Sequence, residues 1–133
     1  VVMTRLLDFD LSKNQIDILK NDNLLNLPNL EKLDLSSNQI ISLSSNLIFR
    51  GLSNLKHLYL NKNKIGKTTG QIFSLLTKLE TLELSDNKFT IANNQIFSNL
   101  KNLIFLNLRR NSLKAIQANA FRDLNNIQNL LDL

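Results

Sequence analysis

Short stretches in which leucines alternate with polar residues recur five times along the chain, and each ends near an asparagine. These asparagines, from Asn14 to Asn111, are separated by 24, 25, 24 and 24 residues. Alternation with a period of two is typical of a β-strand that buries one of its faces. The pattern therefore predicts five short strands, near residues 6–12, 30–36, 55–61, 79–85 and 103–109.

The five stretches are copies of one sequence unit of the form LxxLxLxxNxL. They read LLDFDLSKNQI, LEKLDLSSNQI, LKHLYLNKNKI, LETLELSDNKF and LIFLNLRRNSL, with Phe9 in place of one leucine. The asparagine lies where the chain must turn, and its amide can bond to backbone groups that the turn leaves unpaired. Stacked copies are therefore expected to form an asparagine ladder.

A second periodic set of apolar residues follows each asparagine and closes the coil. Its members are Leu24, Phe49, Phe73, Phe97 and Phe121. A single coil of this length buries too little apolar surface to offset the entropy lost when it is ordered. Stability must come from stacking, so the repeat predicts a solenoid.

This pattern resembles the leucine-rich repeat family, in its typical 24-residue subclass, over nearly the whole chain. The resemblance implies an α/β solenoid, a horseshoe segment with short parallel strands on the concave face and irregular or 3-10 turns on the convex face. The interpretation is one domain over 1–133, with about five full repeats and an incomplete repeat over 121–133, where Asp132 falls at a core leucine position. Extracellular family members carry cysteine-containing caps that this sequence lacks, so we interpret it as a fragment whose uncapped ends could self-associate.

Composition narrows the classes of partner. The chain has 16 Lys and Arg against 11 Asp and Glu, and no Cys. The basic residues are interspersed with acids, and the one adjacent pair is Arg109-Arg110, so no nucleic acid partner is expected. No apolar run is long enough to cross a bilayer, so no membrane insertion by this segment is expected.

The segment GKTTG, from Gly66 to Gly70, resembles the end of a phosphate-binding loop. Such a loop requires a glycine five residues before the first of these positions, and Asn61 stands there instead. The segment is therefore interpreted as an irregular turn of one repeat. A small contact site on that rim is the alternative.

Catalysis has little support in the sequence. His57 is the only histidine, and without cysteine neither a catalytic triad nor a histidine-based metal site can be assembled from the usual residues. We expect no enzyme activity, no cofactor and no metal. The carboxylates of Asp10 and Asp34 leave a cation as a minor alternative.

Binding is the natural use of a concave parallel sheet, whose outward side chains should form columns down the stack. One column reads Asp10, Asp34, Tyr59, Glu83 and Asn107, a second reads Asp8, Lys32, His57, Thr81 and Phe105, and a third reads Lys13, Ser37, Lys62, Asp86 and Arg110.

Aromatic residues and arginine are frequent anchors of protein interfaces. We therefore expect a site for a protein ligand or co-receptor on the third to fifth strands, with the convex loops around Lys67 as the competing site. The expected contact residues are His57, Tyr59, Glu83, Phe105, Arg109 and Arg110.

The resemblance extends to Toll-like receptors and insect immune leucine-rich repeat proteins. It implies ligand recognition by a receptor ectodomain or a secreted immune or adhesion protein outside the cell. The alternative is an intracellular scaffold in the cytoplasm. The absence of cysteine and of any N-x-S/T glycosylation sequence favours that alternative.

Overall fold

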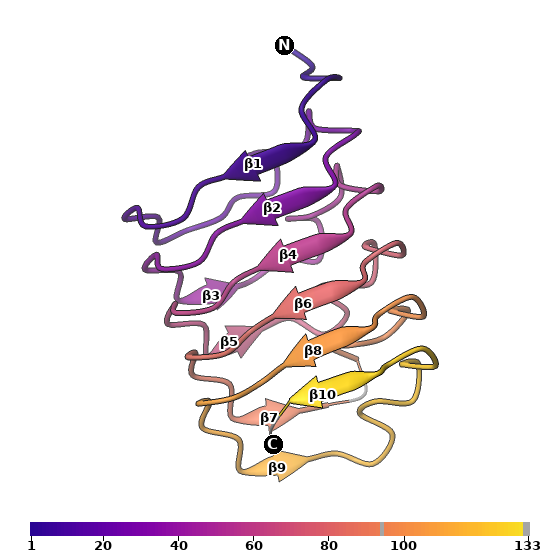
Figure 1. The fold of residues 1–133 in the computed structure, drawn as a ribbon. Helices are drawn as coiled ribbons and strands as arrows, with labels where there is room; N and C mark the ends of the chain where they lie inside the picture. The colour runs from indigo at the N-terminus through magenta and orange to yellow at the C-terminus, as the bar shows by residue number, and fades with distance from the viewer. Residues whose placement is uncertain (94, 132–133) are drawn as a thin grey trace.

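The computed structural model describes residues 1–93 and 95–131, which form a stack of coils (Figure 1). Each coil adds one strand to a six-stranded parallel sheet, and we number the coils 1 to 6 in chain order. The sheet confirms the predicted leucine-rich repeat solenoid. Its strands are β1 (Asp8–Asp10), β2 (Lys32–Asp34), β4 (His57–Tyr59), β6 (Thr81–Glu83), β8 (Phe105–Asn107) and β10 (Asn129–Leu131).

The sixth strand, β10, was not among the five predicted ones. It lies in the segment interpreted as an incomplete repeat, where it pairs with β8 in the same register as the preceding strands. The expectation for Asp132 falls outside the described residues.

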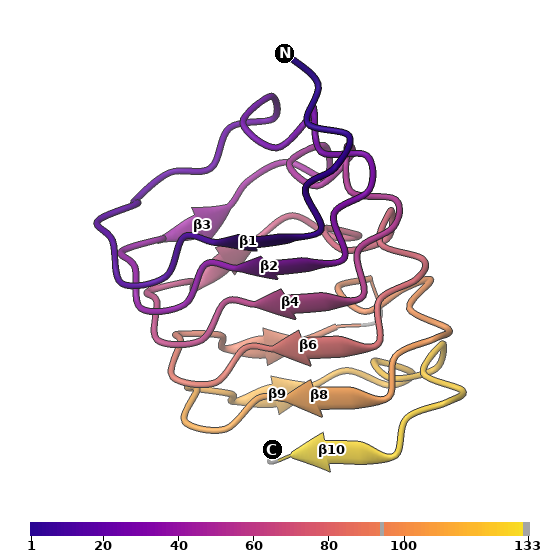
Figure 2. The same ribbon diagram turned by 45° about the horizontal axis from the view of Figure 1, so that its top comes forward.

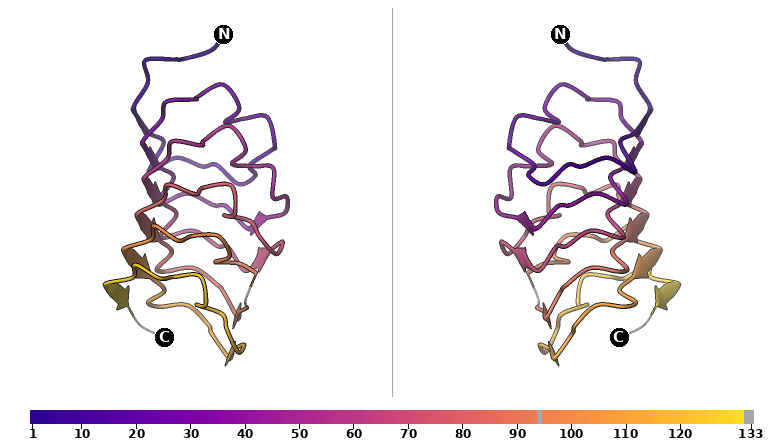
Figure 3. Two further views of the ribbon diagram at one scale, coloured as in Figure 1. Left: turned by 90° about the vertical axis from the view of Figure 1, so that its right-hand side faces the viewer. Right: turned by 90° about the vertical axis from the view of Figure 1, so that its left-hand side faces the viewer.

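Four two-residue strands lie on the side of the stack opposite the main sheet (Figures 2 and 3). They form two separate parallel pairs, β3 with β5 and β7 with β9. Turns and bends make up the rest of this convex side, and no residue of 1–93 or 95–131 is helical. Consequently none of the described residues belongs to a helix long and apolar enough to cross a membrane. The bounds are β3 (Ser42–Leu43), β5 (Lys67–Thr68), β7 (Ile91–Ala92) and β9 (Ala115–Ile116).

The core lies between the main sheet and the convex side. Leu33, Leu58 and Leu82 are paired in register on successive strands, and each is fully buried. Side chains alternate along a strand, so their neighbours face away from the core. The leucines after the strands also point inward, because Leu35, Leu60 and Leu84 are fully buried, as the repeat predicted.

The predicted asparagine ladder is present next to the sheet. The amide nitrogen of Asn63 donates to the carbonyl of Leu35 in the preceding coil at 2.9 Å and to that of Leu60 in its own coil at 3.0 Å. Its amide oxygen accepts the backbone N–H of Ile40 at 3.0 Å. Asn38, Asn87 and Asn111 repeat this arrangement in their own coils.

The convex side is interrupted between coils 3 and 4. Phe49 stacks on Phe73 with ring centroids 5.9 Å apart, and Phe97 stacks on Phe121 at 5.7 Å, so the predicted phenylalanine spine consists of two stacked pairs among the described residues. At the same junction, no strand pairing joins β5 to β7 within the described chain. The main sheet continues across this junction through the pairing of β4 with β6.

Candidate functional site

The outward side chains of the six-stranded sheet form a continuous surface, which we call the sheet face. Strand register places Tyr59 between Asp34 and Glu83. It likewise aligns His57, Thr81 and Phe105 across β4, β6 and β8. The two columns expected within the strands are therefore present in the structure. Tyr59 and Phe105 are not neighbours, because β6 lies between their strands.

The aromatic residues of the sheet face are half-buried and their rings remain partly accessible. The ammonium group of Lys32 lies 5.9 Å from the centroid of the Tyr59 ring, within the range of a cation–π interaction. The same ammonium group lies 3.4 Å from a carboxylate oxygen of Asp8. Tyr59 is therefore oriented by a neighbour on β2, while its hydroxyl makes no hydrogen bond among the described residues.

Hydrogen bonds within the sheet hold several polar side chains in place. Glu83 accepts the backbone N–H of Ser85 at 3.0 Å and the side-chain N–H of Asn107, also at 3.0 Å. A ring nitrogen of His57 lies 3.1 Å from the hydroxyl oxygen of Thr81. These contacts fix the polar groups before any partner arrives, which reduces the entropy lost on binding.

The two adjacent arginines have different surroundings. Arg110 makes two hydrogen bonds to the carboxylate of Asp86, at 2.6 and 2.8 Å. The Arg110 guanidinium holds the pKa of Asp86 below its ordinary value of 3.8. Arg109 is exposed and forms no salt bridge within the described residues. Of the predicted pair, Arg110 is matched by Asp86, whereas Arg109 has no such pair among the described residues.

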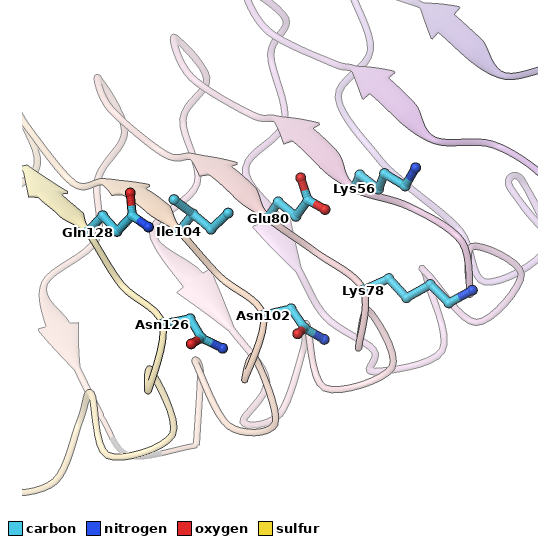
Figure 4. Close-up of a pocket in the computed structure, with 7 residues that line it drawn as sticks. All are labelled: Lys56, Lys78, Glu80, Asn102, Ile104, Asn126 and Gln128. Atoms are coloured by element: carbon cyan, nitrogen blue, oxygen red, sulfur yellow. The ribbon is translucent and has the colours of Figure 1, made fainter.

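A groove runs beside the sheet face, next to the N-terminal ends of the strands (Figure 4). It has a volume of about 360 Å³. Its lining residues lie in two rows, one directly before the strands and one further back in the chain. The rows are Lys56, Glu80, Ile104 and Gln128, and Lys78, Asn102 and Asn126.

This groove was not predicted from the sequence, although a recurring asparagine marks one of its sides. Asparagines recur at positions 29, 54, 102 and 126, and Lys78 takes the corresponding place in coil 4. In the structure Asn54 donates to the carbonyl of Pro28 at 2.8 Å, and Asn102 donates to that of Thr77 at 2.8 Å. The recurrence thus marks a second ladder of asparagines, which forms one wall of the groove.

The acidic column and the GKTTG segment were the other candidate sites. Within residues 1–93 and 95–131, no group of three or more potential metal ligands is gathered. Lys67 and Thr68 of GKTTG form β5, and the chain continues into turns at residues 71–75. The segment therefore lacks the helix that follows a phosphate-binding loop.

Comparisons with known sequences identify the repeat. The family model described as "Leucine rich repeat" matches residues 77–131, and that described as "Leucine Rich repeats (2 copies)" matches residues 28–72. No curated protein sequence matches the chain at a significant level.

Three solved structures resemble the fold and cover 96% of this chain. The Toll–Spatzle complex of Drosophila matches with a TM-score of 0.90 and 28% identity, and the TLR13–ssRNA13 complex with 0.73 and 34%. An internalin of Listeria monocytogenes matches with 0.71 and 27%. The chain spans 17%, 21% and 35% of the three matched chains, respectively.

One of these structures bears on the expected partner. TLR13 is seen in complex with single-stranded RNA. This comparison therefore does not support the expectation that the chain lacks a nucleic acid partner. The sequence argument for that expectation was that basic residues are interspersed with acids. Mixing of basic and acidic residues along the sequence does not determine how they are arranged on the folded surface, because the coils bring residues from distant positions together.

Proposed function

The chain belongs to the leucine-rich repeat family, and we propose that it is a protein-recognition module that binds its partner through the sheet face. The observation that carries this proposal is the combination of accessible aromatic groups at Tyr59 and Phe105 with polar groups held by cross-strand hydrogen bonds. A rigid surface of this kind binds a folded partner with little ordering of its own side chains.

We propose that the contact surface consists of the six residues expected from the sequence, extended by the groove beside the strands. Arg109 contributes a charge that forms no salt bridge among the described residues, whereas Arg110 acts through its pair with Asp86. Lys56 and Glu80 would contact a partner that extends past the N-terminal ends of the strands. The surface offers binding groups and no cluster of catalytic ones, so we propose a recognition role without enzyme activity.

The setting we propose is the ectodomain of a receptor or a secreted immune or adhesion protein. Its support is the likeness to Toll, which is seen in complex with Spatzle. An intracellular scaffold is the second candidate, and the absence of cysteine and of N-x-S/T glycosylation sequences favours it.

A site-specific cross-linking experiment tests the face and the compartment together. A photoreactive side chain at position 59 is expected to capture a protein partner, while the same group at the exposed Leu75, in a turn outside the six-stranded sheet, should not. With the partner purified, Tyr59→Ala and Phe105→Ala should each weaken binding by about 1 kcal/mol or more.

The outcomes of this experiment separate the alternatives. A secreted partner supports the receptor setting, and a cytosolic one supports the scaffold. Capture of RNA at position 59 would replace protein by nucleic acid as the ligand. Unchanged affinity in both alanine variants, combined with loss of binding in a Leu75→Ala variant, would move the site to the convex side.

A further inference from the structure

A basic hollow lies on the side of the stack that leads from the sheet to the convex strands, and the proposed sheet-face site does not include it. It has a volume of about 540 Å³ and is formed by coils 2, 3 and 4. Its lining residues are Ile41, Ser42, Lys64, Gly66, Lys67 and Lys88. Lys67 belongs to the GKTTG segment, so this segment contributes a charge to the hollow.

The three lysines of the basic hollow are not neutralised within the described chain. The salt bridges of the described residues involve other cations, namely Lys32, Arg50, Lys56, Arg110 and Arg122. The sequence explains this, because no Asp or Glu occurs between Asp34 and Glu80 or between Asp86 and Asp123. The side of the stack that carries the hollow is built from these acid-free segments.

Apolar surface accompanies the charges. Ile41, which is 58% exposed, lines the basic hollow. A neighbouring hollow of about 360 Å³ shares Gly66 and Lys67 with it and includes Ile91, which is 44% exposed. Two exposed isoleucines therefore flank the central lysine. Such apolar groups beside cations suit a ligand that carries both carboxylates and an aliphatic side chain.

We propose that the basic hollow binds an acidic segment of a partner protein, with carboxylates at Lys64, Lys67 and Lys88 and an aliphatic side chain against Ile41. Charge complementarity selects an anionic ligand. Single-stranded nucleic acid would require aromatic rings on which bases stack, and Phe89, which borders the neighbouring hollow, is buried. A sulfated glycan would offer no aliphatic group for the isoleucines. This proposal does not depend on the sheet-face site.

A peptide titration followed by NMR tests the proposal on the unaltered chain. The probe is a short synthetic peptide in which glutamates flank a single leucine. Its addition is expected to shift the backbone amide signals of Gly66, Lys67 and Lys88 and to leave those of His57 and Tyr59 unchanged. The affinity should fall as salt is added, because exposed charges are screened.

Charge-reversal variants localise the interaction. K64E/K67E/K88E should weaken peptide binding by about tenfold or more, because three favourable charge pairs become repulsive. The control R5E/K20E/K101E has the same net charge, changes exposed residues outside the hollow and should retain the affinity to within about twofold. Circular dichroism establishes that both triple variants keep the fold. Tyr59→Ala, which changes the sheet face, should bind the peptide like the unaltered chain.

Several outcomes would overturn the inference. Equal losses in the two triple variants would mean that only net charge matters. Amide shifts away from the basic hollow would place the peptide elsewhere. A sulfated oligosaccharide or a single-stranded RNA of matched charge that binds more tightly than the peptide would exclude the proposed occupant. An unchanged affinity when the leucine of the peptide is replaced by serine would remove the role of Ile41.

Discussion

Asn63 illustrates how a single side chain joins two coils. It is 8% exposed, and its amide serves the backbone of coils 2 and 3 at the same time. The carbonyls of Leu35 and Leu60 each keep another amide donor if Asn63 is removed, because Asn38 and Asn87 also bond to them. Among the described residues, the backbone N–H of Ile40 has no such second partner. The cost of losing Asn63 therefore arises mainly at one buried donor.

Replacing Asn63 by alanine is expected to lower the free energy of unfolding by about 2 kcal/mol, the usual cost of an unpaired buried donor. Chemical denaturation of both proteins measures this difference. Asn14→Ala is the matched control, because Asn14 is exposed and, within the described chain, its amide donates only to Leu11 and Ser12 of its own coil. Its loss should stay below about 0.5 kcal/mol. Equal losses at the two positions would contradict the inter-coil role of the ladder.

Eight non-glycine residues in the described part of the chain adopt left-handed backbone conformations, and five of them occupy one column. Lys13, Ser37, Lys62, Asp86 and Arg110 have φ between 52 and 56°. This conformation is uncommon for L-residues other than Asn and Asp. Its recurrence directly before each ladder asparagine shows that the turn geometry imposes it, whatever the side chain. The sequence offered no glycine there from which to predict it.

At the scale of elements, the strands were predictable and the convex side was only partly so. Alternation of leucines located five main strands because a strand that buries one face imposes a period of two. The convex strands contain two residues each, which is too short for any period to show. The phenylalanine spacing predicted the spine, but not the junction at which it divides into two stacked pairs.

Phe73→Ala tests the packing of the spine. Phe73 is fully buried and stacks on Phe49, so its truncation should cost about 3–5 kcal/mol through lost contacts and a cavity. Thermal or denaturant unfolding measures the loss. Phe105→Ala removes the same side chain from the half-buried sheet face and should cost less than about 2 kcal/mol. A Phe73 variant as stable as the Phe105 variant would show that the spine is not tightly packed.

The candidate site, like the fold, was only partly predictable from the sequence. Its two strand columns follow from strand register, which places His57, Tyr59, Glu83 and Phe105 as the repeat predicted. Its internal contacts were not predictable, because the pairing of Arg110 with Asp86 depends on side-chain conformations across two coils. The groove and the basic hollow depend on which residues from several coils meet at one place.

At the scale of the whole molecule, three carboxylates in different coils couple stability to pH. A hydrogen bond from Ser12 lowers the pKa of Asp10 from the ordinary 3.8, and one from Arg110 lowers that of Asp86. A hydrogen bond from the backbone N–H of Asn99 lowers the pKa of Asp123 in the same way. A carboxyl group with a lowered folded-state pKa stabilises the protein above its unfolded pKa. That stabilisation is lost as pH falls through the folded pKa. The described chain should therefore be less stable below pH 3.8 than at neutral pH.

Denaturation at neutral pH and at a pH well below 3.8 measures this dependence. Arg110→Gln should reduce the difference between the two conditions, because the largest cause of the lowered pKa at Asp86 is removed. Arg109→Gln changes the neighbouring arginine, which makes no salt bridge within the described residues, and is the control. An identical pH dependence in both variants would show that the Asp86 pair does not contribute to stability.

The interruption between β5 and β7 has a mechanical meaning. A solenoid resists bending through two layers on opposite sides, here the six-stranded sheet and the convex strands (Figure 3). Between coils 3 and 4 the sheet is continuous, whereas no strand pair joins the convex sides of these two coils among the described residues. A backbone hydrogen bond from Gln71 to the carbonyl of Gln95, at 3.0 Å, joins them there, and the strand pairs β3–β5 and β7–β9 reinforce the junctions on either side. Bending there strains fewer hydrogen bonds than at those two junctions. A bend at this junction would turn about the paired strands β4 and β6, and it would change the curvature of the surface between Tyr59 and Glu83.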